Sequence, residues 1–405
     1  MENDIMTEFI QLHMLASYPP SNLNRDELGR PKTAVVGNIQ RIRISSQSLK
    51  RAWRTSDVFR EVLGDYHLGI RTREMGWNIY CALTTGRTLN DIVFTNDDTV
   101  VNQVIDEENA VVYARSIAEV FGKLKNAEKA KTDKKGKKNK KSQVAEEEDE
   151  TTDLIEKNDQ SEMGKKKRSL CVEQVVNYSP NEIAAIDALI SRITRDNVAP
   201  IKDDLKLLRK QNSAVDIAMF GRMLASSPEF NQDAAVQVAH AFTVHAGVIE
   251  DDCFTAVDDL NPKNGAAHFG ETEFASGLFY LYVCVNRDLL VENLDGDTAL
   301  ADNALRALVE TAAKISPTGK QNSFASRAYA SYLLVEKGHQ QPRSLASAYL
   351  KPAHGADMIE AAITTLNEQR TKMDAVYGVC SDRSCEMNVH TGTGTLTDIL
   401  NFVVE

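Results

Sequence analysis

Apolar and polar positions alternate with a period of two in several stretches of the chain, which predicts β-strands. In the stretch TEFIQLHMLASY, Ile10, Leu12 and Met14 fall on one face, and the following Pro19-Pro20 is expected to end the strand. Residues 234–247 fit either a helix or a strand. Further strands are predicted in RIRI at 41–44, in GLFYLYVCVNRDLL at 277–290 and in the second half of 317–338.

Apolar positions at helical spacing predict helices between these strands. Ser45 or Ser46 is expected to cap the first helix, with Leu49, Ala52 and Trp53 as its buried face. A large helical block between early and late strands indicates an α+β fold with a helical insertion. Helices are predicted through most of 57–122, at 181–196, 202–211 and 304–315, and from 346 up to a polar tail.

Two long stretches fit neither pattern. Residues 251–277 are polar and rich in glycine, and an irregular stretch of this length inside a domain is usually functional. Residues 123–168 contain a lysine block, an acidic block and a second basic block, so almost none of these side chains can be buried. We expect 123–168 to be disordered, either as a tolerated loop insertion or as a tail that binds nucleic acid.

Composition limits the classes of protein that fit. Of the 405 residues, 42% are hydrophobic and 26% are charged, which is ordinary for a globular protein with a sizeable core. The net charge of −11 does not exclude a nucleic-acid partner, because phosphates are bound by local patches. The six cysteines show no paired spacing, which predicts free thiols and no zinc site. Without a signal sequence or a membrane-spanning apolar run, we expect a cytoplasmic protein with no membrane partner.

The most basic stretch is RIRISSQSLKRAWR at 41–54. Arg41 and Arg43 project from the predicted strand, and Lys50, Arg51 and Arg54 lie on the solvent side of the following helix. The serine-rich helix start adds hydroxyl groups, unpaired N–H groups and a partial positive charge. These groups suit phosphate oxygens better than base edges, because they offer no pattern of paired donors and acceptors. The alternative is an amphipathic helix with a solvated basic face.

Other candidate sites are less specific. His240 and His245 could bind a metal, but a separation of five residues is unsuited to one helix face. The turn TGKQNSFA at 318–325 could bring Lys320 near a phosphate, or it could be only a polar turn. The tyrosines after Gly277 could stack on bases or lie in the core. No Walker loop, GxSxG motif or GxGxxG motif is present.

The stretch FIQLHMLASYPPSNLNRDELGRPKTAVVGNIQRIRISSQSLKRAWR resembles the N-terminus of the CasC family, the guide-RNA (crRNA)-binding backbone subunits of type I-E CRISPR Cascade complexes in the RAMP superfamily. VDIAMFGRML, FTAVDDL, GAAHFGETEFASGLFYLY and GKQNSFA continue the resemblance in order. It implies a modified RRM/ferredoxin-like palm, inserted helical fingers and a β-hairpin thumb. The implied division is palm at 5–60, 215–249 and 277–345, fingers at 61–214, thumb at 250–276, and a C-terminal helical segment and tail at 346–405.

The resemblance also implies a function without catalysis. Several copies would line up along one crRNA, bind its ribose-phosphate backbone and leave the guide bases free to pair with target DNA, in antiviral defence. The implied partners are crRNA, target DNA, further copies of the chain and other Cascade subunits, with no cofactor and no metal. Cleavage of the target would belong to a separate nuclease.

Residues are assigned to the RNA through the same resemblance and the basic stretch. Phe254 in the thumb and Met223, after Gly221-Arg222, are expected to wedge against displaced bases. The alternative function is a metal-dependent endoribonuclease of the same superfamily, in which Asp26 cuts the bound RNA. The full set of expected RNA-binding residues is Asn24, Arg25, Arg41, Arg43, Ser45, Gln47, Ser48, Lys50, Arg51, Arg54, Arg222, Met223, Phe254, Lys320 and Gln321.

Overall fold

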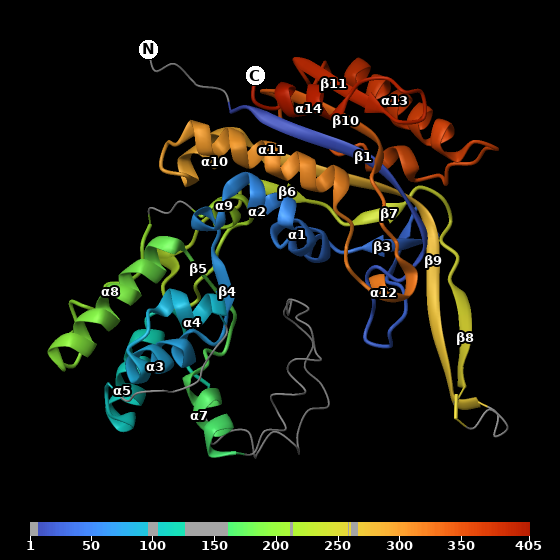
Figure 1. Ribbon diagram of the computed structural model, residues 1–405. Helices are drawn as coiled ribbons and strands as arrows, with labels where there is room; N and C mark the ends of the chain where they lie inside the picture. Colours follow the sequence, from blue (N-terminus) through green and yellow to red (C-terminus); the bar gives the residue numbers. More distant parts are fainter. Residues whose placement is uncertain (1–6, 96–103, 126–160, 211–213, 258, 261–265) are drawn as a thin grey trace, which may run out of the picture. The chain divides into compact units, whose positions relative to one another are not determined.

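The computed structural model describes residues 7–95, 104–125, 161–210, 214–257, 259–260 and 266–405 (Figure 1). Contacts divide the chain into two compact units. Helices together with antiparallel strands confirm the predicted α+β class. Unit 1 comprises Met1–Gly64, Ala235–Glu292 and Gly296–Glu405, and unit 2 comprises Asp65–Ala234 and Asn293–Asp295.

Unit 1 is built on one nine-stranded antiparallel sheet. Its strands are β1 Phe9–Ser21, β2 Thr33–Val36, β3 Ile39–Ile44, β6 Val236–Val238, β7 Ala241–Thr243, β8 Glu250–Val257, β9 Ala266–Asn286, β10 Ala330–Gly338 and β11 Arg383–Asn388. They follow the order β11-β10-β1-β9-β7-β3-β2, and β6 and β8 also pair with β9. β1 lies between β9 and β10 and is buried on both faces for most of its length, so it forms the centre of the unit.

β1 continues past the point where the sequence predicts its end. Pro19 and Pro20 lie inside the strand, which ends at Ser21. The pairing of β1 with β9 shifts in register between Tyr18 and Ser21, so both prolines fall where the regular ladder is interrupted. A proline lacks only the N–H donor, and it is tolerated in a strand at such an irregularity.

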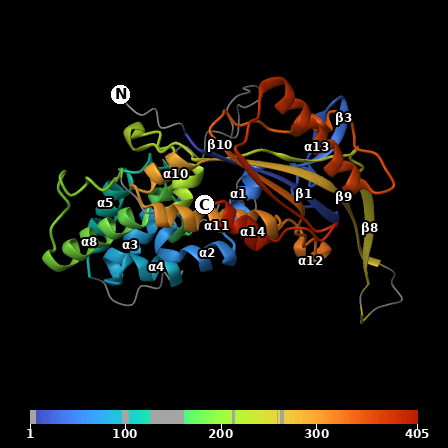
Figure 2. The same cartoon turned by 90° about the horizontal axis from the view of Figure 1, so that it is seen from above.

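Helices cover both faces of this sheet, with α11 on one face and α13 on the other (Figures 1 and 2). The predicted helix at 304–315 is confirmed within α11, and the polar tail, for which no element was predicted, contains the strand β11. The helices are α1 Ser46–Arg54, α2 Asp57–Leu63, α10 Arg287–Asn293, α11 Thr298–Lys314, α12 Gln321–Phe324, α13 Met358–Tyr377 and α14 Leu396–Phe402, with a short 3₁₀ turn η6 at Ala346–Tyr349.

The stretch predicted to be irregular forms a long hairpin in unit 1 (Figure 1). β8 pairs with the first part of β9, from Glu250 opposite Phe274 to Val257 opposite Ala266. The hairpin lies within residues 250–276, for which the resemblance implies a thumb, and that assignment stays a prediction. Residues 234–247, for which the sequence left helix and strand open, contain the two short strands β6 and β7.

Unit 2 is mostly helical, which confirms the predicted helices in 57–122 and at 181–196. None of the described helices in either unit combines the length and the apolar character that crossing a membrane requires. The elements of unit 2 are η1 Asp65–His67, β4 Ile70–Thr72, α3 Met75–Thr85, α4 Leu89–Thr95, α5 Glu107–Ala118, α7 Glu162–Leu170, β5 Val176–Tyr178, α8 Pro180–Asp196, α9 Val215–Phe220 and η4 Pro228–Phe230.

The C-terminal part of unit 2 differs from the sequence-based expectation in two ways. Residues 202–210 form turns and irregular structure rather than the predicted helix, because Glu182 Oε1 accepts the N–H of Arg209 and fixes this segment by a tertiary contact. Unit 2 also extends to Ala234, whereas the predicted fingers segment ended at 214. Asp216 in α9 accepts the N–H of Gly69 at 2.7 Å, which ties α9 to the β4 region.

The charged stretch 123–168 is ordered at both ends. Leu124 is buried and pairs with Val172, and Ser161 caps α7, whose Leu170 is buried. The prediction of disorder is therefore wrong for these ends, because the two leucines anchor them in the core of unit 2. The remainder of the predicted disordered stretch, 126–160, lies outside the described residues.

Candidate nucleic-acid interface

The start of α1 is held in place by hydrogen bonds. The hydroxyl of Ser45 accepts the N–H of Ser48 at 3.3 Å, which makes Ser45 the N-cap that the sequence allowed. The N–H of Ser45 donates to Asn24 Oδ1 at 2.8 Å, so the preceding loop and the helix start form one local structure. Gln47 is exposed in the first turn.

One side of α1 is buried, so its cationic side chains lie on the opposite, exposed side. Leu49, Ala52 and Trp53 are buried, as the sequence predicts. Arg51 is exposed and Lys50 and Arg54 are partly exposed, and α1 contains no acidic residue. We define the basic surface as the side chains of Arg43, Lys50, Arg51 and Arg54.

His240 lies beside this surface, although sequence reasoning considered it only as a metal ligand. Its Nδ1 accepts the N–H of Ser46 at 3.2 Å and lies 3.2 Å from Nη1 of Arg43. Partial burial lowers the pKa of His240, and the charges of Arg43, Lys32 and Lys50 lower it further. The ring is therefore neutral near pH 7. The first N–H of α1 thus has a partner, which corrects the expectation of unpaired N–H groups at this helix start.

Arg41 does not belong to the basic surface. Its side chain is buried and donates to the carbonyl oxygens of Thr243 at 3.1 Å and Tyr349 at 2.8 Å. Burial lowers the pKa of Arg41. The prediction that Arg41 contacts RNA is wrong, because its guanidinium group is enclosed in unit 1 and binds backbone oxygens.

Arg222 is also buried, which corrects the expectation that it contacts RNA. Its Nη1 donates to Glu182 Oε2 at 2.6 Å within unit 2. The backbone of Arg222 exchanges two hydrogen bonds with Gln232, at 2.9 and 3.0 Å. The next residue, Met223, is 76% exposed. Arg222 therefore anchors the segment that presents Met223 rather than facing solvent itself.

The loop before β2 contains Arg25 and Asp26, both exposed. Asp26 Oδ1 accepts the N–H groups of Leu28 at 2.8 Å and Arg30 at 2.9 Å. The carboxylate of Asp26 thus stabilises its own turn, in the manner usual for aspartate in loops. This structural role accounts for an aspartate at position 26 and requires no catalytic function.

Lys320 and Gln321 form contacts within unit 1. Lys320 Nζ donates to Thr272 Oγ1 at 2.6 Å, and Gln321 Nε2 donates to the carbonyl of Pro317 at 3.0 Å. A Cβ atom on the preceding Gly319 would lie 2.3 Å from the carbonyl oxygen of Leu23. This close approach requires glycine and brings the turn at 317–325 against the loop that precedes β2.

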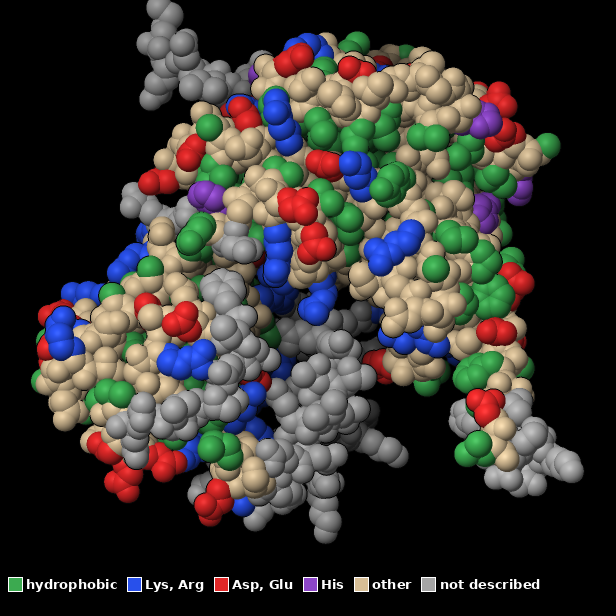
Figure 3. All heavy atoms as spheres, in the orientation of Figure 1, with side chains coloured by type: hydrophobic (Ala, Val, Ile, Leu, Met, Phe, Trp, Pro, Cys, Tyr) green, Lys and Arg blue, Asp and Glu red, His purple; other side chains and the backbone are tan. Residues whose placement is uncertain are grey.

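The hairpin of β8 and β9 is acidic and carries exposed aromatic rings. Phe254 is 46% exposed and lies opposite Gly270 in the register. A Cβ atom on Gly270 would come within 2.3 Å of the ring of Phe254, so only glycine leaves space for the ring there. Acidic side chains are visible along the hairpin in Figure 3. Those among the described residues are Glu250, Asp251, Asp252, Asp259, Glu271 and Glu273.

The structure brings together one part of the expected RNA-binding set. Asn24 and Arg25 lie in the loop tied to α1, and Lys320 and Phe254 lie at the hairpin, all in unit 1. Met223 belongs to unit 2. The members on β3 and in α1 that remain candidates are Arg43, Ser45, Gln47, Ser48, Lys50, Arg51 and Arg54.

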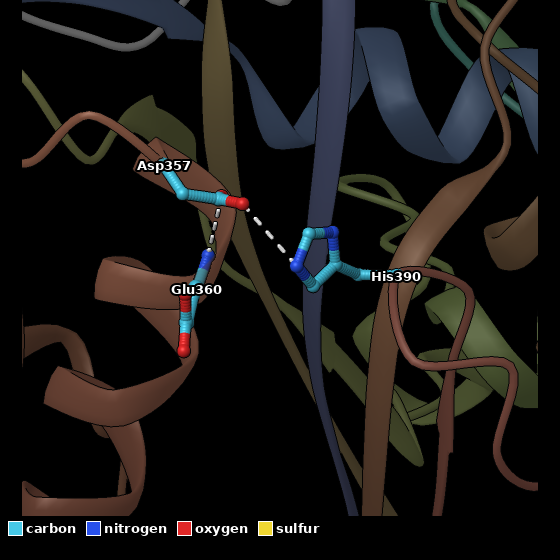
Figure 4. A group of neighbouring side chains, drawn as sticks. All are labelled: Asp357, Glu360 and His390. Atoms are coloured by element: carbon cyan, nitrogen blue, oxygen red, sulfur yellow. Dashed lines mark hydrogen bonds and ion pairs between the residues drawn. The ribbon is translucent and has the colours of Figure 1, made fainter.

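Among the described residues, Asp357, Glu360 and His390 form the one group of three whose potential metal ligands all lie within 4.8 Å of one another (Figure 4). Asp357 Oδ1 caps α13 by accepting the N–H of Ile359 and of Glu360, and its Oδ2 lies 3.2 Å from His390 Nε2. Helix capping and an exposed contact between a carboxylate and an imidazole ring account for this group. His245, in contrast, accepts the N–H of Leu278 with Nε2.

Of the tyrosines that follow Gly277, Tyr280 belongs to the interior of unit 1 and Tyr282 is partly buried. Tyr280 is buried, and its hydroxyl contacts His13 Nδ1 at 2.9 Å and accepts the N–H of Leu345 at 3.1 Å. Burial raises the pKa of Tyr280. Of the two interpretations left open by the sequence, the core position is the one that the structure supports for this residue.

Two solved structures are similar to the chain over nearly its whole length. One is a chain described as "CRISPR RNA-guided surveillance complex, pre-nicking", with 27% identity, a TM-score of 0.71, and coverage of 98% of this chain and 99% of that chain. The other is described as "CRISPR RNA-guided surveillance complex", with 23% identity, a TM-score of 0.62, and coverage of 98% and 99%. At 23% identity the second likeness shows the fold alone. No curated protein matches the chain.

A profile of one protein family matches residues 10–400, which is almost the entire chain. The match includes both units and the segments on which the resemblance to the CasC family rests, and it confirms that resemblance. The chain belongs to the CT1975-like protein family.

Proposed function

We propose that the chain is a guide-RNA-binding backbone subunit of a CRISPR RNA-guided surveillance complex. The observation that carries this proposal is the full-length likeness, at 27% identity, to a chain of such a complex. The family match over residues 10–400 supports the same conclusion.

The basic surface is the part of unit 1 that we assign to the ribose-phosphate backbone. Arg43, Lys50, Arg51 and Arg54 carry four positive charges on one strand and one helix without an acidic residue between them. Cations of this kind bind phosphate oxygens and carry no information about base sequence. Guide bases would therefore remain free to pair with target DNA, which delegates sequence recognition to base pairing.

Several copies of the chain are proposed to bind side by side along one crRNA, together with other subunits of a type I-E Cascade complex. Each copy then needs only modest affinity, because neighbouring copies on one strand add avidity. In this arrangement unit 1 without its hairpin is the palm, the hairpin of β8 and β9 is the thumb, and unit 2 corresponds to the fingers. Phe254 and Met223, both exposed, remain the proposed wedges against displaced bases.

The chain itself is proposed not to cut RNA. An endoribonuclease that uses Asp26 would need its carboxylate for chemistry, whereas one oxygen of that carboxylate already accepts two backbone N–H groups in its own turn. We therefore assign Asp26 to loop structure.

The test is a titration of purified protein into labelled single-stranded RNA with magnesium, followed on native and denaturing gels. We expect a ladder of shifted species whose number of steps grows with RNA length, over RNA that stays intact. Shortened RNA whose appearance depends on Asp26 would support the ribonuclease instead. Absence of any shifted species would contradict RNA binding by the chain.

A further inference from the structure

His240 occupies a defined position in the strand ladder. It lies in the two-residue link between β6 and β7. β3 and β7 are antiparallel, with Arg43 opposite Phe242 and Ile44 opposite Ala241. One further step along this ladder brings His240 next to the residues with which α1 begins. The pairing of β3 with β7 therefore places the imidazole ring beside the first residues of α1.

The contacts of His240 define which ring nitrogen carries the proton. Nδ1 faces two donors, the N–H of Ser46 and Nη1 of Arg43, each at 3.2 Å. An imidazole nitrogen that faces two donors must be the acceptor, so the proton of the neutral ring lies on Nε2. Among the residues that the structure describes, Nε2 has no hydrogen-bond partner, and the side chain is exposed.

The electrostatic surroundings of His240 keep its ring neutral. The charges around it are all positive: Arg43, Lys32 and Lys50 each lower the pKa of His240, in addition to partial burial. A neutral ring can therefore hold the guanidinium group of Arg43 without charge repulsion. An arginine side chain has several rotatable bonds, so fixing one end before binding reduces the entropy lost when it meets a phosphate.

We propose, on the basis of the proposed function, that His240 is the positioning residue of the basic surface and adds one donor to it. Nδ1 holds Arg43 next to the first turn of α1, and Nε2–H donates to a phosphate oxygen of the bound RNA. His240 thus links the helix start to the anion: Nδ1 accepts the first N–H of α1, and Nε2–H donates to the anion.

The test is the affinity of the full chain for a fluorescein-labelled single-stranded RNA at pH 8, measured by anisotropy for Arg43→Ala, His240→Ala and the double variant. Each single variant should lose about tenfold in affinity, the typical worth of a charge-assisted hydrogen bond. Because His240 acts partly through Arg43 and partly through its own Nε2–H, the double variant should lose about thirtyfold rather than the roughly hundredfold expected from independent sites.

A conservative variant separates the two roles of the ring. In His240→Asn the Oδ1 atom replaces Nδ1 as acceptor, but the N–H groups of its Nδ2 do not reach the position of Nε2–H, so affinity should fall by only about threefold. The dependence of affinity on salt should be unchanged in His240→Ala, because a neutral ring releases no counterion, but weaker in Arg43→Ala. His339→Ala, which removes an exposed histidine from an ion pair with Asp382, is the control and should bind normally.

Wild-type affinity of His240→Ala, or a fully multiplicative loss in the double variant, would overturn the positioning role. Thermal unfolding of each variant checks that the chain is folded, and His240→Phe, which keeps a ring but has no nitrogen atoms, provides the same comparison if His240→Ala is unstable. If Arg43→Ala itself bound RNA as wild type does, the fault would lie with the assigned basic surface and hence with the proposed function, not with His240 alone.

Discussion

The basic surface and the acidic hairpin belong to the same unit, yet they carry opposite charge. Residues 41–54 contain five cations and no acid, whereas 250–274 contains seven acids and one lysine. The net charge of −11 hides this separation. A hairpin of that charge repels phosphates, so any contribution it makes to RNA binding must come from its exposed rings rather than from ionic contacts.

The two regions also differ in how the fold supports them. α1 packs against the rest of unit 1 through Leu49, Ala52 and Trp53, so the face of the helix that carries its cations is fixed. The hairpin is a two-stranded ribbon whose described residues at 250–256 are all exposed. We conclude that the rigid element is suited to binding a phosphate backbone, and the exposed ribbon is suited to reaching a neighbouring molecule.

The largest effect is expected for the stability of the chain when Arg41, the buried arginine of the basic stretch, is replaced. Arg41→Ala should lower the free energy of unfolding by about 3 kcal/mol, because two buried carbonyl oxygens lose their charged donor. Arg43→Ala should change it by only about 0.5 kcal/mol, since Arg43 is at the surface. Urea denaturation of both variants measures the difference. Equal losses of stability would show that Arg41 and Arg43 do not differ as a buried and a surface residue should.

Reversing the charge of the hairpin tests the comparison directly. Asp251→Lys combined with Asp252→Lys should raise the affinity of the chain for single-stranded RNA by about tenfold at 0.1 M salt, because repulsion of phosphate is replaced by attraction. Glu292→Lys with Glu368→Lys gives the same change in net charge at exposed positions elsewhere in unit 1. An equal gain in this control would mean that net charge, not the hairpin, governs the affinity.

A smaller effect is expected from the contact between Phe254 and Gly270. Gly270→Val places atoms where the ring of Phe254 lies, so the ring must move. Binding of the first copy to RNA should stay within about twofold, while binding of further copies should weaken by about fivefold, as for a lost stacking contact. Native gels resolve the two steps. Thr255→Val is the control, and a loss confined to the first copy would contradict the assignment.

Much of the fold could be predicted from local patterns. The alternation of Ile10, Leu12 and Met14 and the helical spacing of Leu49, Ala52 and Trp53 correspond to observed elements. Tertiary contacts decided the rest: Glu182 fixes 202–210 as irregular structure, and a register shift accommodates Pro19-Pro20 inside β1. Cross-strand pairing also turned the glycine-rich stretch 251–277 into a hairpin, which no local pattern showed.

Only the part of the candidate site that lies on α1 could be predicted from the sequence. Lys50, Arg51 and Arg54 follow from the helical period, because the buried face determines the exposed one. Arg41 and Arg222 were misassigned because sequence does not show which arginines are enclosed by backbone oxygens and carboxylates. His240 was missed because its partner strand lies about two hundred residues earlier in the chain.

The salt dependence of RNA binding by Lys50→Glu with Arg51→Glu tests most directly whether the exposed cations of α1 bind RNA phosphates. We predict a loss of affinity of at least about a hundredfold at 0.1 M salt, with the logarithmic salt slope reduced by about 1.4 for two lost phosphate contacts. Arg306→Glu with Lys372→Glu makes the same change in net charge and should bind nearly as the wild type does. Equal behaviour of the two double variants would contradict the account.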